Sequence, residues 1–453
     1  MKKILALIMA LALVMGLAVT ASAAKITITP APVPEGGTAS DPVYTAYKIL
    51  DASLSGPLGT NPDEAPNTTT PVTYTIDKSS PYKTVLAKYF DFEDVPGDAT
   101  KQVAKKKVNF DAAALAADLA PVLTGETGTA TKVDGKFVID NLDPGYYVIT
   151  SSVGGNMIVD TLDEVTIESK NAYPTLEKKV NGEKSITADM GAPLTFTIVV
   201  TIPKGASGEI VVHDKLTGIS YDQITTEDGI LAETGTDGCS FHFVLTEEFV
   251  EENRGKDITL TYTGKLRDSV PGTNEAWLVY GNFTSKHDIV TVDTACLKIF
   301  KYDANDKTNT LKDAQFTLSK VVDGKTYYFS YTDNTMRSVE WTEDKTKAHI
   351  AWTGVDGVDY FNGLADGTYT LTEVAAPNGY NLLTEPVEVP ISAAAPDETS
   401  TSGHKFIVVE VPNSTGSELP STGGIGTTLF YVVGALMMTG AAVLMITKKR
   451  MSV

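Results

Sequence analysis

Cysteine is scarce in this chain. Only two occur in 453 residues, Cys239 and Cys296. Exported domains with small cores often depend on several disulfides. Two cysteines exclude such a framework. Because we assign them to separate domains, we predict two independent thiols, and the alternative in an exported protein is one disulfide between them. The domains must therefore draw their stability from another source.

Basic charge is also low. Lys and Arg number 37 against 57 Asp and Glu, so the formal net charge is −20. A surface of this sign stays soluble and repels phosphate groups. The composition therefore excludes nucleic acid and anionic lipid as partners.

Signatures of catalysis and metal binding are missing. The five histidines show no metal-ligand spacing. Asp303–Asp306 resembles half a calcium loop, but Lys307 follows where an acceptor is required, so we interpret it as a turn. No nucleophile–base motif and no phosphate-binding glycine loop occurs. We therefore predict no cofactor, no metal and no enzyme with a diffusible substrate.

The first residues predict export. Met1-Lys2-Lys3 is basic, Ile4–Val19 is apolar, and Ala21-Ser22-Ala23 is a small-residue cleavage site. This is the pattern of a secretory signal peptide, which we assign to residues 1–23.

The other end, residues 414–453, carries a tether, a short motif, an apolar run and a basic tail. The motif is Leu419, Pro420, Ser421, Thr422, Gly423. Ile425–Ile446 is uncharged and is about the length that crosses a bilayer as a helix. The basic residues 448–450 suit a cytoplasmic flank.

This order of motif, span and basic tail resembles the cell-wall sorting signal of Gram-positive surface proteins. The resemblance implies that a membrane sortase cuts between Thr422 and Gly423. The Thr carboxyl then passes to an amine, in a peptidoglycan precursor or on a lysine of a neighbouring subunit. The alternative is a tail-anchored protein with a chance motif, which requires three features to coincide in order.

Residues 24–172 read as short strands broken by Gly, Pro, Asn and Asp. Strands are predicted at Val43–Leu50, Lys136–Asp140 and Gly145–Thr150, and a short helix within Phe110–Leu123. This pattern predicts a β-sandwich with insertions. It resembles the N-terminal domain of sortase-assembled pilins.

Residues 173–292 give a second all-β pattern. Strands are predicted at Leu194–Val200, Glu209–Asp214, Ile258–Leu266 and Ala276–Tyr280. The segment resembles the isopeptide-forming second domain of fimbrial shaft pilins. The resemblance rests on three places, which are Leu-x-Lys-x-Val at 176–180, Val-His-Asp-Lys-Leu at 212–216 and Gly-Thr-Asn-Glu-Ala at 272–276.

Residues 293–413 form a third unit, which opens on Leu297–Asp303 and closes on Phe406–Asn413. Between them Tyr369–Tyr380 reads Tyr-x-Leu-x-Glu-x-x-Ala-Pro-x-Gly-Tyr. This resembles the B-type repeat of collagen-binding adhesins, a small immunoglobulin-like sandwich. The predicted fold is therefore all-β, with tandem immunoglobulin-like β-sandwich domains, a cleaved signal peptide and a C-terminal transmembrane helix.

Residues 293–413 carry charged side chains where an apolar strand face is expected. Side chains alternate along a strand, so Lys301 shares a face with Leu297 and Ile299. By the same alternation Glu373 shares a face with Tyr369. Unpaired buried charges are costly, so a buried ion pair is one expectation. Desolvation also lowers a Lys pKa and raises a Glu pKa, which favours a neutral amine beside a protonated acid.

The family resemblance adds a chemical role for these residues. It implies that Lys301 is a nucleophile, Asn413 an electrophile and Glu373 the acid that promotes the reaction. The amine attacks the Asn side-chain carbonyl, ammonia leaves, and an isopeptide bond joins the first and last strands. The buried ion pair remains the alternative.

Residues 173–292 offer a nucleophile, an acid and an electrophile of the same kinds. Lys178 shares a face with apolar neighbours, whereas Lys179 points away. The resemblance implies that Asp214 is the acid and Asn274 the electrophile; the alternative is a surface lysine and a turn asparagine. In residues 24–172, Lys48 and Asn171 could pair, but the strand Gly145–Thr150, which matches the strand that carries Glu373, has no glutamate.

These features predict the structural shaft subunit of a covalently polymerised surface pilus, secreted and anchored to the cell wall. The implied partners are sortase, neighbouring pilin subunits and the peptidoglycan precursor. The alternative is a monomeric wall-anchored adhesin that binds a host or matrix ligand.

One departure concerns the lysine that joins subunits. Shaft pilins usually carry Tyr-Pro-Lys between their first two domains, and here Thr175 follows Tyr173-Pro174. We therefore assign the intersubunit lysine to Lys170, with Lys179 as the second choice.

Overall fold

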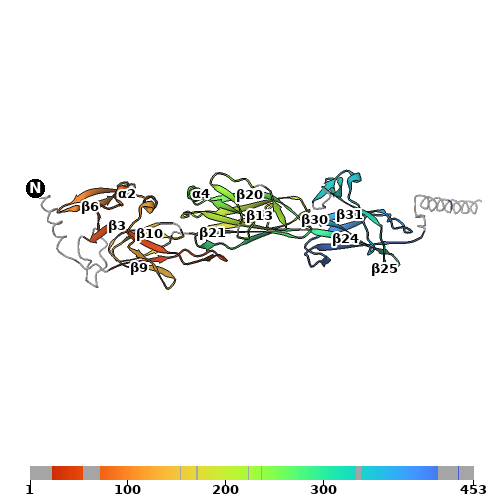
Figure 1. Cartoon of the computed structure of the whole chain (residues 1–453), viewed down its shortest axis with the longest axis horizontal. Helices are drawn as coiled ribbons and strands as arrows, with labels where there is room; N and C mark the ends of the chain where they lie inside the picture. The colour runs from red at the N-terminus through yellow and green to blue at the C-terminus, as the bar shows by residue number, and fades with distance from the viewer. Residues whose placement is uncertain are drawn as a thin grey trace, which may run out of the picture. The chain divides into compact units, whose positions relative to one another are not determined.

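The computed structural model describes residues 23–54, 72–153, 155–169, 172–222, 224–235, 237–332, 338–416 and 437. Over these residues the chain is built mainly of β-strands (Figure 1). The strands of the described residues form six sheets, and the chain divides into two compact units. The first unit comprises Met1–Ile186, Pro193–Arg267 and Pro271–Val292, and the second Thr187–Ala192, Asp268–Val270 and Asp293–Val453.

The first unit begins with two sheets. One has the order β12 (Glu164–Glu168), β1 (Ala24–Thr29), β9 (Lys136–Leu142), β8 (Thr131–Val133). The other has the order β11 (Met157–Thr161), β10 (Gly145–Ser151), β3 (Tyr44–Leu54), β4 (Val72–Asp77), β6 (Asp98–Lys106), β5 (Phe90–Val95), with β7 (Gly128–Thr129) on β3.

Strand β10 is buried on both faces. Tyr147 and Ile149 pack in a core with β1 and β9, whereas Tyr146 and Val148 pack in a second core with the helices. The helical segments are α2 (Lys83–Leu86), α3 (Ala112–Leu119) and η1 (Ala120–Val122). A strand covered on both faces reads as a continuous apolar run, as Gly145–Thr150 does in the sequence.

The predicted helix is present as α3 and has a capped start. The side chain of Asp111 accepts hydrogen bonds from the backbone N–H groups of Ala113 (2.8 Å) and Ala114 (3.1 Å). Such an N-cap satisfies donors that have no partner within the helix. The helix passes at Ala120 into the 3₁₀ turn η1, which contains Pro121.

Two further sheets complete the first unit. One has the order β13 (Thr175–Val180), β15 (Pro193–Thr201), β20 (Asp257–Leu266), β17 (Ile219–Tyr221). The other has the order β14 (Ser185–Thr187), β23 (Asp288–Asp293), β21 (Gly272–Tyr280), β16 (Ile210–Thr217), β19 (Phe241–Leu245), β18 (Ile230–Thr234). Helix α4 (Glu247–Glu252) follows β19.

These two sheets share a core. Tyr262 on β20 contacts Phe241 on β19, with ring centroids 5.0 Å apart, and Phe196 on β15 at 5.2 Å. Buried residues alternate with exposed ones along β20 and with partly buried ones along β21, as inward and outward side chains do along a strand. Strand β22 (Phe283–Thr284) pairs with β21 and with β2 (Thr38–Ala39), so a segment from the start of the chain joins this sheet.

The second unit is one sandwich. Its first sheet has the order β25 (Asp306–Thr310), β24 (Ala295–Asp303), β34 (Lys405–Asn413), β33 (Glu398–Thr399), with β30 (Val358–Leu364) also on β24. Its second sheet has the order β28 (Val339–Thr342), β27 (Lys325–Tyr331), β26 (Gln315–Val322), β31 (Gly367–Ala375), β32 (Val387–Ile391), with β29 (Ala351–Trp352) on β26. The 3₁₀ turn η2 spans Lys345–Lys347.

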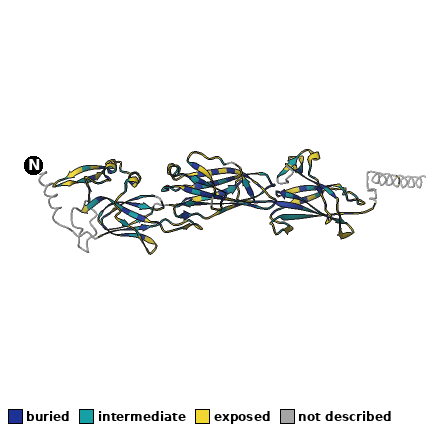
Figure 2. Ribbon diagram, viewed as in Figure 1, coloured by how far each residue is buried: buried dark blue, intermediate teal, exposed yellow. Residues whose placement is uncertain are grey.

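The first and last long strands of this unit are neighbours. Strands β24 and β34 run parallel, and their register pairs Lys301 with Val411 and Asp303 with Asn413. Buried residues from both sheets, including Leu297, Phe316 and Leu371, form the core between them (Figure 2).

Short Asp-Gly turns fix the register of two hairpins. Asp134 and Gly135 have φ values of 49° and 79° between β8 and β9, and Asp323 and Gly324 have 51° and 76° between β26 and β27. Two-residue hairpins need positive φ at both central positions, which Asp and Gly tolerate best. The sequence therefore encodes these turns locally.

The prediction of tandem all-β sandwiches is confirmed, and the turn expected at Asp303–Asp306 lies between β24 and β25. Both cysteines are free and buried. The predicted signal peptide, the sorting motif and the apolar run Ile425–Ile446 lie outside the described residues. Among those that are described, none of the helices has the length and apolar character needed to cross a membrane. The three-domain boundaries remain a prediction.

Candidate functional site

Three polar side chains meet in the core of the second sandwich of unit 1. Lys178 comes from β13, Asp214 from β16 and Asn274 from β21, and each is 0% exposed. The Lys178 Nζ donates to Asp214 Oδ2 at 2.5 Å. Because β13 belongs to one sheet and the other two strands to the opposite sheet, the cluster links both layers. The structure therefore brings the three predicted residues together.

Tyr262 completes this cluster, and the sequence analysis missed it. Its hydroxyl donates to Asp214 Oδ2 (2.8 Å) and accepts from Lys178 Nζ (2.9 Å) and from the side-chain amide of Asn274. Burial raises the pKa of Tyr262 well above its usual value, so the hydroxyl keeps its proton. Alternation along β20 marks Tyr262 as inward-facing, but only the fold shows which polar groups it meets.

The cluster of Lys178, Asp214, Tyr262 and Asn274, which we call the first cluster, has too few hydrogen-bond donors for its acceptors. The Oδ1 atoms of Asp214 and Asn274 are buried and accept no hydrogen bond. Burial lowers the pKa of Lys178 and raises the pKa of Asp214. Both shifts favour the neutral amine and the carboxylic acid, and a proton on Asp214 supplies a donor that the orphaned oxygens lack.

The second cluster lies in unit 2. Lys301 on β24, Glu373 on β31 and Asn413 on β34 are 0%, 4% and 2% exposed. The Lys301 Nζ donates to Asn413 Oδ1 and to the Val411 carbonyl oxygen (3.0 Å), and it lies 3.5 Å from Glu373 Oε1. The Asn413 Nδ2 donates to both carboxylate oxygens of Glu373, at 3.0 and 3.2 Å. A backbone N–H, that of Leu383, also holds Glu373 (2.8 Å).

This arrangement places each group at a different end of the Asn413 amide. The amine lies at the carbonyl oxygen, and the carboxyl group of Glu373 lies at the nitrogen. Burial lowers the pKa of Lys301 to about 8, so an appreciable fraction of the amine is neutral near neutral pH. A nucleophile at the carbonyl and a proton carrier at the leaving nitrogen are the parts that amide exchange requires.

The first sandwich has no equivalent cluster among its described residues. The side chain of Lys48 is 24% exposed and pairs with Asp51 (2.9 Å) and Asp143 (3.3 Å). Asn171 lies outside the described residues. Lys48 is thus a half-buried, ion-paired lysine.

The other predicted residues are placed as follows. Lys170 and the sorting residues Leu419, Pro420, Ser421, Thr422, Gly423 lie outside the described residues. Lys179 on β13 points outward; its side chain is 40% exposed, and its Nζ lies 3.4 Å from Glu177 Oε1.

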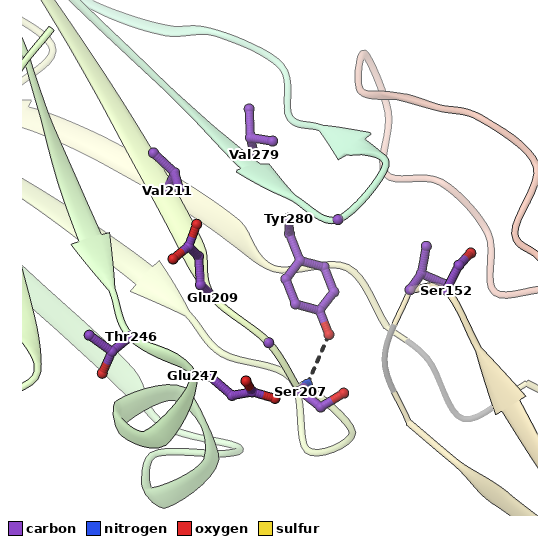
Figure 3. A pocket seen from close by; sticks show the side chains of 11 residues that line it. Ser152, Ser207, Glu209, Val211, Thr246, Glu247, Val279 and Tyr280 are labelled. Atoms are coloured by element: carbon purple, nitrogen blue, oxygen red, sulfur yellow. Dashed lines mark hydrogen bonds between the residues drawn. The ribbon is translucent and has the colours of Figure 1, made fainter. Parts of the chain in front are cut away.

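Unit 1 also contains an open cavity of about 560 Å³ (Figure 3). The Tyr280 hydroxyl accepts a hydrogen bond from the backbone N–H of Ser207 (2.9 Å) at its wall. The acidic side chains of Glu209 and Glu247 line it, together with serine, threonine and valine.

Four potential metal ligands meet elsewhere in unit 1. They are His213, Asp237, Cys239 and His242, and their ligand atoms all lie within 4.8 Å of one another. The histidines show no ligand spacing in the sequence, because His213 is far from the other three residues in the chain. Pairing of β16 with β19 brings them together.

Two segments of the chain match family models. Residues 296–405 match the SpaA prealbumin-like fold domain, and residues 411–452 match the LPXTG cell wall anchor motif. These matches define a class, the cell-wall-anchored surface proteins of Gram-positive bacteria, and they confirm the predicted sorting signal. Within that class the predicted resemblance to sortase-assembled pilins is confirmed by the SpaA-type domain and by a fimbrial relative.

That relative is the fimbrial subunit type 1 of Actinomyces viscosus, 33% identical over 98 residues, which cover 20% of this chain and 18% of the relative. The trypsin-resistant surface T6 protein of Streptococcus pyogenes serotype M6 is 24% identical over 215 residues, 43% of this chain and 38% of that protein. The chain thus spans well under half the length of these curated relatives.

Solved structures include two full-length pilins. The major pilin SpaD from Corynebacterium diphtheriae has 18% identity and a TM-score of 0.47, and the match covers 87% of this chain and 98% of that chain. The RrgB pilus protein from Streptococcus pneumoniae has 13% identity and a TM-score of 0.46, and the match covers 88% and 99%.

Proposed function

We propose that this chain is the structural shaft subunit of a covalently polymerised surface pilus, cross-linked internally by Lys–Asn isopeptide bonds and joined to its neighbours by sortase. The observation that carries the internal cross-link is the contact of the Lys301 amine with the Asn413 side chain. It lies between the first and last strands of unit 2. A subunit that transmits tension along a filament needs a tie at this position.

The proposed reaction in unit 2 uses the geometry of the second cluster. The neutral amine of Lys301 attacks the side-chain carbonyl carbon of Asn413. A new C–N bond forms, the original amide C–N bond breaks, and the nitrogen of Asn413 leaves as ammonia. Glu373 transfers the proton that the amine loses to the leaving nitrogen, since its oxygens lie 3.0 and 3.2 Å from that atom.

The same reaction in unit 1 joins Lys178 to Asn274. Asp214 carries the proton, and Tyr262 holds the amine, the acid and the amide in one network. The buried oxygens without donors support a protonated Asp214 in this role. A buried ion pair without a covalent bond is the competing interpretation for both clusters.

Intact mass of the purified protein tests the internal bonds. Each bond removes one ammonia, so the mature chain should be lighter than its calculated mass by two ammonia molecules. The full calculated mass would contradict the proposed chemistry at both sites.

Assembly would then follow from the sorting signal. Sortase cuts between Thr422 and Gly423 and passes the Thr carboxyl to a lysine of the next subunit or to the peptidoglycan precursor. Lys170 is the proposed acceptor, and Lys179, which is exposed, is the second choice. Tandem mass spectrometry of digested polymer should detect a branched peptide that links Thr422 to one of them.

The competing function is a monomeric wall-anchored adhesin for a host or matrix ligand. Thr175, at the place where shaft pilins usually have lysine, favours it. An immunoblot of wall extracts separates the two: a ladder of high-mass species supports the shaft subunit, and a single band supports the adhesin.

A further inference from the structure

The four potential metal ligands of unit 1 lie on the neighbouring strands β16 and β19 and in the turn between β18 and β19. His213 on β16 lies directly opposite His242 on β19, and their ring centroids are 4.5 Å apart. Asp237 and Cys239 belong to the turn that connects β18 to β19. Two imidazoles, a carboxylate and a thiol therefore converge on one point, although the chain separates His213 from the others.

The bonding of His213 is incomplete as it stands. Its side chain is 11% exposed, and its Nδ1 is a buried nitrogen without a hydrogen-bond partner. Oδ2 of Asp237 lies 3.0 Å from this nitrogen, and Oδ1 of the same carboxylate forms a hydrogen bond of 3.2 Å with Nε2 of His242. A proton on the imidazole can occupy each of these nitrogen–carboxylate contacts, and a cation bound by the same atoms can replace that proton.

The surroundings hold these ligands in place. The ring of His213 stacks on Trp277, with centroids 4.9 Å apart and an angle of 5° between the planes. The backbone N–H of Ser240, next to Cys239, donates to the Asp214 carbonyl oxygen at 2.7 Å. At Gly235 a Cβ would lie only 2.5 Å from the Cys239 sulfur, so glycine allows the turn to close over the thiol.

We propose that these residues form a structural Zn²⁺ site, with the ligands Nδ1 of His213, the carboxylate of Asp237, the thiolate of Cys239 and Nε2 of His242. Mixed N, S and O donors suit Zn²⁺, whose bonds of about 2.0–2.3 Å in a tetrahedron place ligand atoms roughly 3.3–3.8 Å apart. The observed spread within 4.8 Å needs only a small closure. On binding, the thiol of Cys239 releases its proton to solvent.

Access and location suit a structural role. The side chain of Asp237 is 46% exposed, which gives the ion a path from solvent. His213 directly precedes Asp214, the acid of the first cluster, on β16. The ion would therefore link β16 to the β18–β19 hairpin.

Metal binding by the purified full-length chain tests the site. After treatment with a chelator, titration with ZnCl₂ at neutral pH should show one ion per chain. Co²⁺ as a probe should give a thiolate charge-transfer absorption. The substitutions Cys239→Ser and His242→Ala should each weaken Zn²⁺ binding at least tenfold. The control His287→Ala alters a histidine that stacks on Trp277 but lies outside the cluster, and it should bind as the parent does.

Protection of the thiol gives a test that needs no variant. Zn²⁺ should slow alkylation of Cys239 at least tenfold and leave the other cysteine, Cys296, unchanged. The proposal is overturned if binding is not stoichiometric, if both Cys239→Ser and His242→Ala bind as tightly as the parent, or if Zn²⁺ does not protect Cys239.

Discussion

Lys301 shows how burial changes the chemistry of one side chain. The residue is 0% exposed, and burial lowers its pKa to about 8. A charged amine there would cost several kcal/mol without a partner. Both a neutral amine and an amide bond relieve that cost, which is why a buried lysine beside an asparagine is prepared for the proposed reaction.

At this scale the role of Glu373 can be tested by Glu373→Gln. The substitution keeps the shape of the side chain but removes the group that exchanges protons, so the bond in unit 2 should fail to form. Intact mass should then show a deficit of one ammonia instead of two. The matched control is Glu410→Gln, which changes an exposed residue of β34 and should keep both. A deficit of two in Glu373→Gln would show that Glu373 carries no proton in the reaction.

The pKa of Lys301 also predicts a pH dependence. Only the neutral amine attacks, and the folded-state pKa of about 8 lies below the ordinary 10.5. When unreacted chain from inclusion bodies is refolded, the rate of ammonia loss in unit 2 should be half-maximal near pH 8. It should fall about tenfold for each unit below that. Mass spectrometry over time measures the rate; a rate that does not change between pH 6 and pH 9 would exclude a titrating amine.

The same pKa shift predicts a trend in stability. Between pH 8 and 10.5 the unfolded chain keeps a proton on Lys301 that the unreacted folded chain has lost. In Asn413→Ala, which keeps Lys301 but cannot form the bond, unit 2 should therefore become more stable as the pH rises through this window, and denaturant unfolding across it measures the trend.

Sequence alternation predicted which lysines point inward, because the period of a strand is a local property. It identified Lys178 over Lys179 and placed Lys301 on an apolar face, and the structure finds both residues buried. It could not predict the hydroxyl of Tyr262 beside Asp214, or the four-ligand cluster. Those contacts depend on which strands become neighbours, and that is decided by packing across the whole sandwich.

Among the elements, the strands β24 and β34 determine how unit 2 holds together under tension. They open and close unit 2 and lie side by side in parallel. Hydrogen bonds alone would let the last strand peel from the sheet, whereas a covalent link at Lys301 and Asn413 would hold it.

The variant Asn413→Ala removes that link. A cross-link that closes a loop of roughly 100 residues stabilises by about 5 kcal/mol through the unfolded state, so unit 2 should unfold at lower temperature and lose protease resistance. Thermal unfolding and trypsin half-life measure the change. Asn309→Ala, on the exposed strand β25, is the control. Comparison with Glu373→Gln separates loss of the bond from loss of the side chain, and unchanged melting in both variants would argue against a covalent tie.

Local signals predicted the elements better than their pairing. The runs between Gly, Pro, Asn and Asp predicted strands such as Lys136–Leu142 and Gly145–Ser151 within a residue or two. The pairing of β2 with β22 was not foreseen, nor was the assignment of Thr187–Ala192 to the second unit. Both join segments that are far apart in the chain, for which no local pattern exists.

For the molecule as a whole, the sorting motif determines whether the protein is attached to the cell wall or stays in the membrane. In the double variant Leu419→Ala, Pro420→Ala the sortase should fail to recognise its substrate, and the protein should stay in the membrane through Ile425–Ile446. Cell fractionation and immunoblotting measure this. Ser421→Ala, at the variable position of the motif, is the control and should be sorted normally. Covalent attachment of the double variant to the wall would place the signal elsewhere.

The register of β24 and β34 has a mechanical consequence once the proposed bond forms. Tension that enters at the start of β24 crosses to Asn413 at Lys301 and leaves by the end of β34. The residues between Lys301 and Asn413, which are 112 positions apart in the chain, lie off the load path. They correspond to a contour length on the order of 380 Å, which pulling could not release. A single proteolytic nick within that bypassed loop would leave the filament continuous, because the load already runs through the side-chain bond.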